Sequence, residues 1–212
     1  MCQRSDIMVL HRNRNTGITP IHSSEGISTA QRHVNLQTLE HVIVLAIEIA
    51  REGREGKKIG TIFVVGDSEN VLRNSRCLIL DPLWHHPLEM KHIENSDVRE
   101  TVKELAQLDG AFVVDNSGIF LSACRYLNAS AEGIAQPLGL GSRHMAAASI
   151  TKQTDAVAVV VSESAIVRVF DDGEVVGEII PELWMLKNYS LHLTGPYSTR
   201  TEDQVTVVSK DQ

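Results

Sequence analysis

Short apolar strands alternate with helical segments between residues 36 and 180, and this alternation restricts the possible folds more than any other feature. The clearest strand, residues 156–161, is a run of six apolar residues that leads into Ser162 and Glu163. Such a strand is buried, and the neighbouring helices are the elements that can cover it. Two hairpins add antiparallel pairs. We therefore expect an α/β fold, a single globular domain whose mixed, largely antiparallel-containing central sheet is flanked by helices.

Apolar periodicity and turn residues place these elements along the chain. Helical spacing predicts helices over residues 36–50 and 98–108, the second with Ser96 as its N-cap, and an alanine-rich helix after residue 141. Strands are expected within residues 59–67, 111–114, 119–123, 156–161, 165–170 and 174–180. Two Xaa-Pro pairs, at Pro82 and Pro87, predict a long loop with short structured pieces over residues 69–96.

The two ends of the chain are more polar than its middle. We expect residues 1–35 to form an N-terminal extension, residues 36–182 to form the domain, and residues 183–212 to form a weakly structured C-terminal tail. No secretory signal peptide is visible, and the longest apolar runs have six residues, far short of the roughly 20 that cross a bilayer. The sequence therefore predicts a protein without a membrane partner.

Charge and cysteine content exclude several classes of function. The net charge of −7 argues against a general binder of nucleic acids or anionic membranes, because both need a basic face. The three cysteines, Cys2, Cys77 and Cys124, are odd in number and widely spaced, so they predict no disulfide framework. A reducing, cytoplasmic location is the expectation that fits these features.

An acid and a glycine, Asp109 and Gly110, lie where the helix at residues 98–108 gives way to the next strand. This pair allows two interpretations. It is either a simple helix stop, or a carboxylate directed into a site beside a backbone that a ligand can approach closely.

A glycine-containing loop precedes the alanine-rich helix. Gly139 and Gly141 let a ligand approach the backbone, Ser142 is a natural N-cap, and the first helical turn offers free amides and a positive dipole end to a phosphate. Arg143 adds a fork of donors, and His144 adds either a further donor or a structural brace. The alternative is an ordinary capped helix with a solvated arginine.

The apolar strand at residues 156–161 ends in Ser162 and Glu163. Polar groups at the carboxyl end of a buried strand often bind ligands in α/β proteins. Ser162 is a candidate for contact with a phosphate or base, and Glu163 for contact with a metal or an arginine. The alternative is a strand that leaves the core through a polar turn.

Taken together, these motifs resemble those of the diadenylate cyclase family, which joins two ATP molecules into cyclic di-AMP. The resemblance covers about residues 38–180 and includes the supporting segments EGREGKKIGTIFVVGD, ETVKELAQLDGAFVV and CRYLNAS. The match comprises an Asp-Gly-Ala motif, the Ser-Arg-His part of a Thr/Ser-Arg-His-Arg motif and the Ser-Glu part of a Ser-Glu-Glu motif: Asp109, Gly110, Ala111, Ser142, Arg143, His144, Ser162 and Glu163.

The resemblance implies a metal-dependent nucleotidyltransferase that works as a homo-oligomer. Two domains would face each other, each with one ATP, and a divalent ion, Mn²⁺ or Mg²⁺, would bind at Asp109 and Glu163. Asp109, Arg143 and His144 would be catalytic. The implied nucleotide-binding residues are Gly110, Ala111, Tyr126, Leu127, Gly141, Ser142, Ser162 and Glu163.

Two positions depart from the family pattern and leave an alternative open. Met145 stands where the family has an arginine, and Ser164 stands where it has a second acid. These departures are compatible with a catalytically impaired nucleotide-binding sensor of the same fold. A third alternative is an interaction domain in which the motifs only pack.

Two further features have ordinary interpretations. His85, His86 and His92 invite a zinc hypothesis, but their spacing fits no standard ligand pattern and a surface loop explains them better. Cys124 is expected to be a small buried hydrophobe. No hydrolase elbow or Walker motif is present.

Overall fold

The computed structural model describes residues 9–12, 18–21, 34–128, 134, 141–181, 197–202 and 205–210. The chain divides into a unit of residues 1–181 and a second unit of residues 182–212. The first unit contains the α/β domain with a mixed sheet that the sequence predicts. Within the described residues, no helix is both long and apolar enough to cross a membrane.

A seven-stranded sheet forms the centre of the first unit, with strand order β4-β6-β5-β3-β7-β8-β9. Only β3 and β5 pair in parallel, and the other neighbours pair antiparallel. The strands are β3 (Thr61–Val65), β4 (Ser75–Cys77), β5 (Ala111–Val114), β6 (Phe120–Leu127), β7 (Val157–Val161), β8 (Val167–Asp171) and β9 (Glu174–Ile179). The mixed sheet and both predicted hairpins are therefore confirmed.

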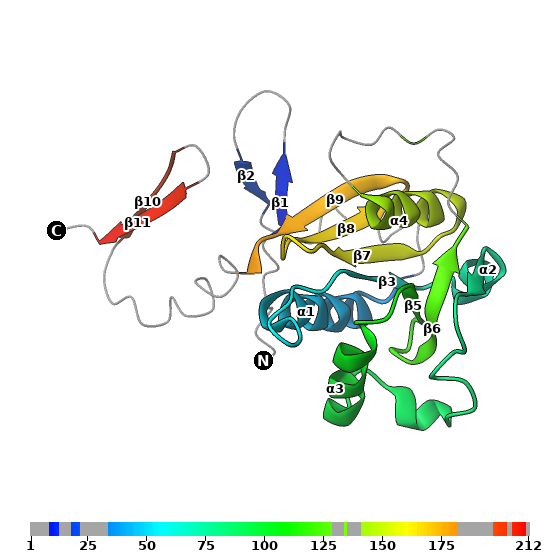
Figure 1. Cartoon of the computed structure of the whole chain (residues 1–212). Coiled ribbons are helices and arrows are strands. Elements are labelled where there is room, and N and C mark those ends of the chain that lie inside the picture. The colour runs from blue at the N-terminus through cyan, green and yellow to red at the C-terminus, as the bar shows by residue number, and fades with distance from the viewer. Residues whose placement is uncertain are drawn as a thin grey trace, which may run out of the picture. The chain divides into compact units, whose positions relative to one another are not determined.

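Helices cover both faces of the sheet (Figure 1). The helix α1 (Leu36–Glu52) lies on one face and α4 (Ser142–Gln153) on the other. The strands between them carry no exposed residue: all five residues of β3 and all five of β7 are buried. This double coverage explains why these strands are apolar apart from Thr61, instead of alternating with polar residues.

The two faces have cores of different composition. On the α4 side, alanines of the helix pack against small aliphatic residues of β3, β5 and β7, which lets the helix approach the sheet closely. Another part of the core contains aromatic rings: Phe63 stacks on Phe112 with centroids 5.1 Å apart, and Phe120 meets both rings edge-on.

The helix α3 (Ser96–Leu105) corresponds to the predicted helix at residues 98–108 but begins two residues earlier and ends three residues earlier. Ser96 is its first helical residue and not its N-cap, so this prediction is wrong. Asn95 caps the helix instead, because its side chain accepts a hydrogen bond from the Asp97 amide at 2.9 Å.

The segment before α3 contains short elements, as its prolines predict. These are α2 (Ser68–Arg73), the edge strand β4 and the 3-10 helix η2 (Leu88–Lys91). Asp81 anchors the loop between β4 and η2 on β6, through the Ser122 hydroxyl at 2.5 Å and the Ala123 amide at 3.1 Å.

Each terminal segment holds a two-stranded antiparallel sheet. In the predicted extension β1 (Val9–Arg12) pairs with β2 (Ile18–Ile21). In the second unit, within the predicted C-terminal tail, β10 (Tyr197–Glu202) pairs with β11 (Val205–Lys210). Cys2 and Gly139 lie outside the described residues.

Candidate active site

Three chain segments meet at one edge of the central sheet. The first residue of β3, Thr61, lies opposite Val161, the last residue of β7, because these strands are antiparallel. The parallel strand β5 places its first residue, Ala111, opposite Ile62. The residues just before β3 and β5 and those just after β7 therefore lie together, although Gly60 and Glu163 are 103 positions apart in sequence.

Arg143, in the first turn of α4, lies between two carboxylates at this edge. Its Nη1 is 2.9 Å from Glu163 Oε1, and its Nη2 is 3.6 Å from Asp109 Oδ1. The side chains of Asp109 and Glu163 are 89% and 70% exposed, whereas that of Arg143 is 35% exposed. The structure thus brings together one predicted residue from each of the three motifs, with one cation between two accessible carboxylates.

The start of α4 differs from the prediction in one detail. Gly141 is the N-cap residue and Ser142 is the first helical residue, so Ser142 does not cap the helix. No side-chain hydrogen bond caps this end within the described part of the chain. The His144 and Met145 amides donate to the Gly141 carbonyl oxygen. The amides of Ser142 and Arg143 can serve another acceptor, and the helix dipole favours an anionic one.

His144 is a buried brace behind Arg143. Its Nε2 lies 3.1 Å from Arg168 Nη1, and Arg168 Nε donates to Glu178 Oε2 at 2.9 Å. Burial, with a smaller contribution from the Arg168 charge, lowers the pKa of His144 to about 4. Since a guanidinium only donates, the neutral ring accepts at Nε2 and carries its proton on Nδ1. Of the two roles predicted for His144, the geometry favours the brace, and direct participation in catalysis stays a prediction.

Gly110 has a structural reason to be glycine. Its φ is +111°, and a Cβ at this position would lie 2.6 Å from the carbonyl carbon of Cys124 and 2.7 Å from the Arg125 amide nitrogen. The backbone of β6 crosses here at a bulge, where buried Cys124 itself has a φ of 54°. A contact between Gly110 and a nucleotide stays a prediction, as does one for Ala111, which is buried in the core.

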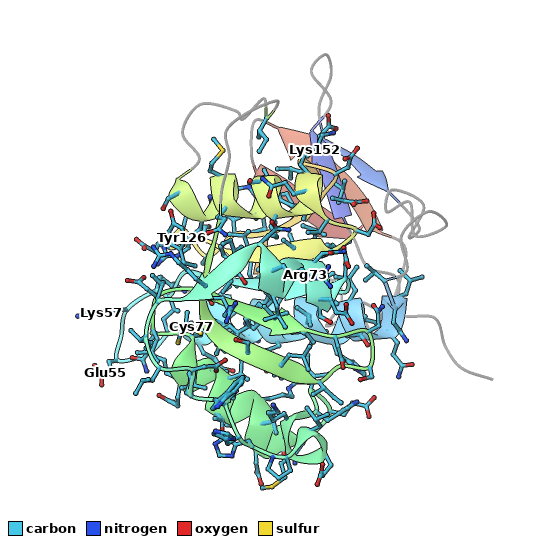
Figure 2. All side chains as sticks on the ribbon, turned by 90° about the vertical axis from the view of Figure 1, so that its right-hand side faces the viewer. Glu55, Lys57, Arg73, Cys77, Tyr126 and Lys152 are labelled. Carbon is cyan, nitrogen blue, oxygen red and sulfur yellow. The ribbon has the colours of Figure 1, made fainter. Side chains whose placement is uncertain are left out.

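Tyr126 and Leu127 point to opposite faces of β6. Leu127 is buried among the residues packed under α4, so a nucleotide contact there would come from its backbone. Tyr126 is 45% exposed, and the guanidinium of Arg76 lies 4.7 Å from the centroid of its ring (Tyr126 is labelled in Figure 2). These two residues therefore cannot both offer side chains to one adenine pocket on a single face of the strand.

Ser162 takes part in a tight turn. Its hydroxyl donates to the backbone oxygen of Ile166 at 3.0 Å and shares a hydrogen bond with Ser164 Oγ at 2.8 Å, and the residue is only 8% exposed. A phosphate contact by this hydroxyl would have to replace these bonds. Ser164, which stands where the family has a second acid, serves here as a partner within the turn.

The carboxylates at the edge fit a metal ion that arrives with a nucleotide. No group of three or more His, Cys, Asp or Glu residues suited to a metal is found among the described residues. Asp109 and Glu163, however, offer the one or two carboxylates with which proteins bind Mg²⁺ when phosphates supply further ligands. The three histidines for which the sequence analysis discounted a zinc site are placed as a surface loop predicts. His92 Nε2 lies 2.7 Å from the Ser117 carbonyl oxygen, and His85 and His86 are exposed.

Sequence reasoning missed two residues of this site. Gly60 lies directly against the Arg143 guanidinium, and Arg168 holds His144. Gly60 lies in one of the supporting family-like segments but in none of the three motifs, and Arg168 lies in neither. Only the antiparallel register of β3 against β7, and of β7 against β8, shows that these residues lie beside the first turn of α4.

Comparison with known proteins adds evidence from sequence similarity. The family model described as DisA bacterial checkpoint controller nucleotide-binding matches residues 48–175. A protein of Methanocaldococcus jannaschii named diadenylate cyclase is 49% identical over 146 residues, which cover 68% of this chain and 46% of that protein. One of Haloferax volcanii with the same name is 44% identical over 149 residues, which cover 69% of this chain and 54% of that protein. The chain thus spans about half the length of these relatives.

The fold has a counterpart among solved structures. A structure described as a hypothetical membrane-spanning protein from Bacillus cereus superposes with a TM-score of 0.51 at 20% identity, over 73% of this chain and 67% of that one. This likeness concerns the fold alone. The family match and the two relatives confirm the resemblance that the three motifs predict: this chain belongs to the DisA-type nucleotide-binding family of diadenylate cyclases.

Proposed function

We propose that this chain is a diadenylate cyclase, which condenses two ATP molecules into cyclic di-AMP and releases pyrophosphate. The observation that carries the proposal is the Asp109–Arg143–Glu163 cluster, in which three separate motifs supply one cation and two carboxylates at one sheet edge. Two relatives at 44% and 49% identity bear the name of this activity. A nucleotidyltransfer needs groups of this kind, one to handle a proton and others to bind phosphate.

In the proposed reaction each ribose 3′-oxygen bonds to the α-phosphorus of the other ATP. The bond between the α- and β-phosphates breaks, pyrophosphate leaves, and the hydroxyl proton passes to a base. Asp109 suits that role because its carboxylate is exposed and lies two residues before the buried strand β5. Arg143 and the uncapped amides of α4 suit the binding of phosphates and of the charge that develops on the leaving pyrophosphate.

The open geometry of this edge supports a reaction shared between two copies. Asp109 and Glu163 are exposed, so one copy leaves the reacting groups accessible to solvent on this side. Excluding water strengthens electrostatic interactions in a site. A second copy that faces the first across two nucleotides would cover the edge and supply the second ATP, which makes a face-to-face homodimer the active unit.

Asp109 and Glu163 are the residues that would hold a divalent ion. When bound, Mn²⁺ or Mg²⁺ would neutralise phosphate charge and favour ionisation of the hydroxyl. Both carboxylates also contact Arg143, and Ser164 offers no acid, so the protein supplies few ligands. We expect higher activity with Mn²⁺, which binds tightly to a sparse oxygen site, than with Mg²⁺, which is reluctant to lose its waters. The few cysteines and the ATP substrate favour a cytoplasmic location.

A nucleotide-binding sensor of the same fold is the second candidate. The observations that favour it are Met145, which stands where the family has an arginine, and the commitment of Ser162 and Ser164 to a turn. Such a protein would retain the phosphate contacts of Arg143 and α4 without efficient turnover.

A product assay discriminates between these candidates. The purified chain is incubated with ATP and either Mn²⁺ or Mg²⁺, and the products are separated and identified by mass. Cyclic di-AMP with pyrophosphate supports the cyclase. No product, together with an ATP-dependent rise in melting temperature, supports the sensor. If ATP gives no product and does not raise the melting temperature, both candidates are contradicted and the interaction domain is the remaining interpretation.

A further inference from the structure

The guanidinium of Arg143 lies directly over the α-carbon of Gly60. A Cβ built on Gly60 would be 2.6 Å from Arg143 Nη1, 3.0 Å from Cζ and 3.3 Å from Nε. Three atoms of one planar group thus occupy the space that any other side chain would fill. The contact joins the residue before β3 to the first turn of α4.

Backbone conformation does not explain the glycine. The φ of Gly60 lies outside the left-handed region, in contrast to Gly53, Gly66 and Gly110, whose φ values are +59°, +82° and +111°. An alanine could therefore adopt the backbone of residue 60 without strain. What the glycine provides at this position is room for the guanidinium.

That room sets the position of the cation relative to both carboxylates. Glu163 follows β7 and Asp109 precedes β5, the two strands that flank β3 in the sheet. Gly60 precedes β3 itself and so lies between them. A guanidinium seated on residue 60 can reach both acids, whereas one displaced by a methyl group has to leave at least one of them.

We propose that Gly60 is the positioning residue for Arg143: its missing side chain seats the guanidinium between Asp109 and Glu163, ready to bind phosphate. The claim that Arg143 binds phosphate rests on the proposed function, whereas the claim that Gly60 positions the guanidinium does not. Gly60 touches the nucleotide only through Arg143, so its effect should disappear when the guanidinium is removed.

The test is a double-mutant cycle with Gly60→Ala and Arg143→Ala in the full chain. Cyclic di-AMP formation and the dissociation constant for ATP with Mn²⁺ are measured for all four proteins. We expect Gly60→Ala to lower the rate by about 10- to 150-fold in the parent, the range of one charged hydrogen bond. In the Arg143→Ala background the same substitution should change the rate less than about 2-fold.

Stability provides the control for a purely structural role. Because alanine fits the backbone of residue 60, Gly60→Ala should leave the melting temperature unchanged or raise it slightly. Equal losses of activity in both backgrounds, or no loss in the parent, would overturn the proposal. The proposal would also be overturned if Gly60→Ala lowered the melting temperature and still reduced activity in the Arg143→Ala background.

A crystal structure of Gly60→Ala without nucleotide separates this inference from the proposed function. The contact of Arg143 Nη1 with Glu163 Oε1, 2.9 Å in the parent, should be broken or lengthened in the variant. If the parent makes no cyclic di-AMP but the contact breaks in Gly60→Ala, the proposed reaction is wrong and Gly60 still positions Arg143. If the contact persists in the variant, Gly60 does not position Arg143, whatever the activity.

Discussion

Two groups of charged side chains in this molecule differ in how completely they are satisfied. Between α1 and α3, Lys103 Nζ lies 2.8 Å from Glu100, 3.1 Å from Glu48 and 3.2 Å from Glu52, and its side chain is only 7% exposed. At the sheet edge, Arg143 meets two carboxylates that are 70% and 89% exposed.

The difference separates a structural ionic network from a binding site. The ammonium of Lys103 has used its three donors on three glutamates, so a ligand has nothing to gain there. Burial alone would lower the pKa of Lys103, but the hydrogen bonds of these glutamates outweigh it and raise the pKa. At the sheet edge, the contacts among the described residues leave carboxylate lone pairs and guanidinium donors unused. The first group should contribute to stability, and the second should act on a substrate.

The largest expected effect is at Asp109. Asn at this position is nearly isosteric but cannot accept a proton, so Asp109→Asn should lower cyclic di-AMP formation by at least about 100-fold. The side chain is 89% exposed, so the melting temperature should stay the same. Product formation above about a tenth of the parent rate would remove Asp109 from the chemistry.

The buried brace behind Arg143 should make stability depend on pH. The pKa of His144 is about 4 in the folded protein, against 6.5 for an ordinary histidine. As the pH falls from 6.5 to 4 the unfolded chain binds a proton that the folded chain does not, so the free energy of unfolding should fall by roughly 3 kcal/mol.

Denaturant unfolding between pH 7 and pH 4.5 measures this contribution. His144→Gln, which does not titrate, should show a shallower dependence on pH than the parent. Equal slopes in the two proteins would mean that His144 is not held neutral by burial and Arg168.

The structural network should respond in stability and not in activity. Lys103→Met removes the cation that three glutamates share, and we expect a loss of about 2 kcal/mol in the free energy of unfolding. The matched control is Lys152→Met, because Lys152 (labelled in Figure 2) makes one ion pair with Asp172 at 3.1 Å and is 47% exposed.

The control substitution should cost less than about 1 kcal/mol. Both variants should retain the activity of the parent at temperatures where they are folded. A drop in activity without a drop in stability for Lys103→Met would contradict the division between the two charged groups.

The smallest expected effect is at Met145, and it sharpens the comparison within the site. If Arg143 is the phosphate anchor, Arg143→Ala should lower kcat/KM by about 10- to 150-fold, whereas Met145→Ala should change it less than about 3-fold. Steady-state kinetics with Mn²⁺ measures both. Equal costs would mean that Arg143 does not anchor the phosphates, and the sensor alternative would gain.

The sequence predicts the parts of the site that carry chemical groups in recognisable order. Asp109, Arg143 and Glu163 each allow an ordinary structural interpretation alone, and only the three motifs together, in the order that the family has them, predict a shared site. Apolar runs such as residues 157–161 likewise predict buried strands, since burial on both faces excludes polar residues.

Residues whose role depends on the pairing of distant strands could not be predicted. Gly60 is one glycine before a strand, and only the register of Thr61 against Val161 places it under a side chain 83 positions away. The position of helix caps was also uncertain, because Asn95 and Ser96 are both good caps and local energies differ little between neighbours.

The central claim is that this edge is half of a site that a second copy completes. Specific activity and mass in solution, measured together over a range of protein concentrations, test it most directly. We predict that specific activity rises with concentration in parallel with the population of dimer and then reaches a plateau. Full specific activity from a demonstrated monomer would contradict the claim.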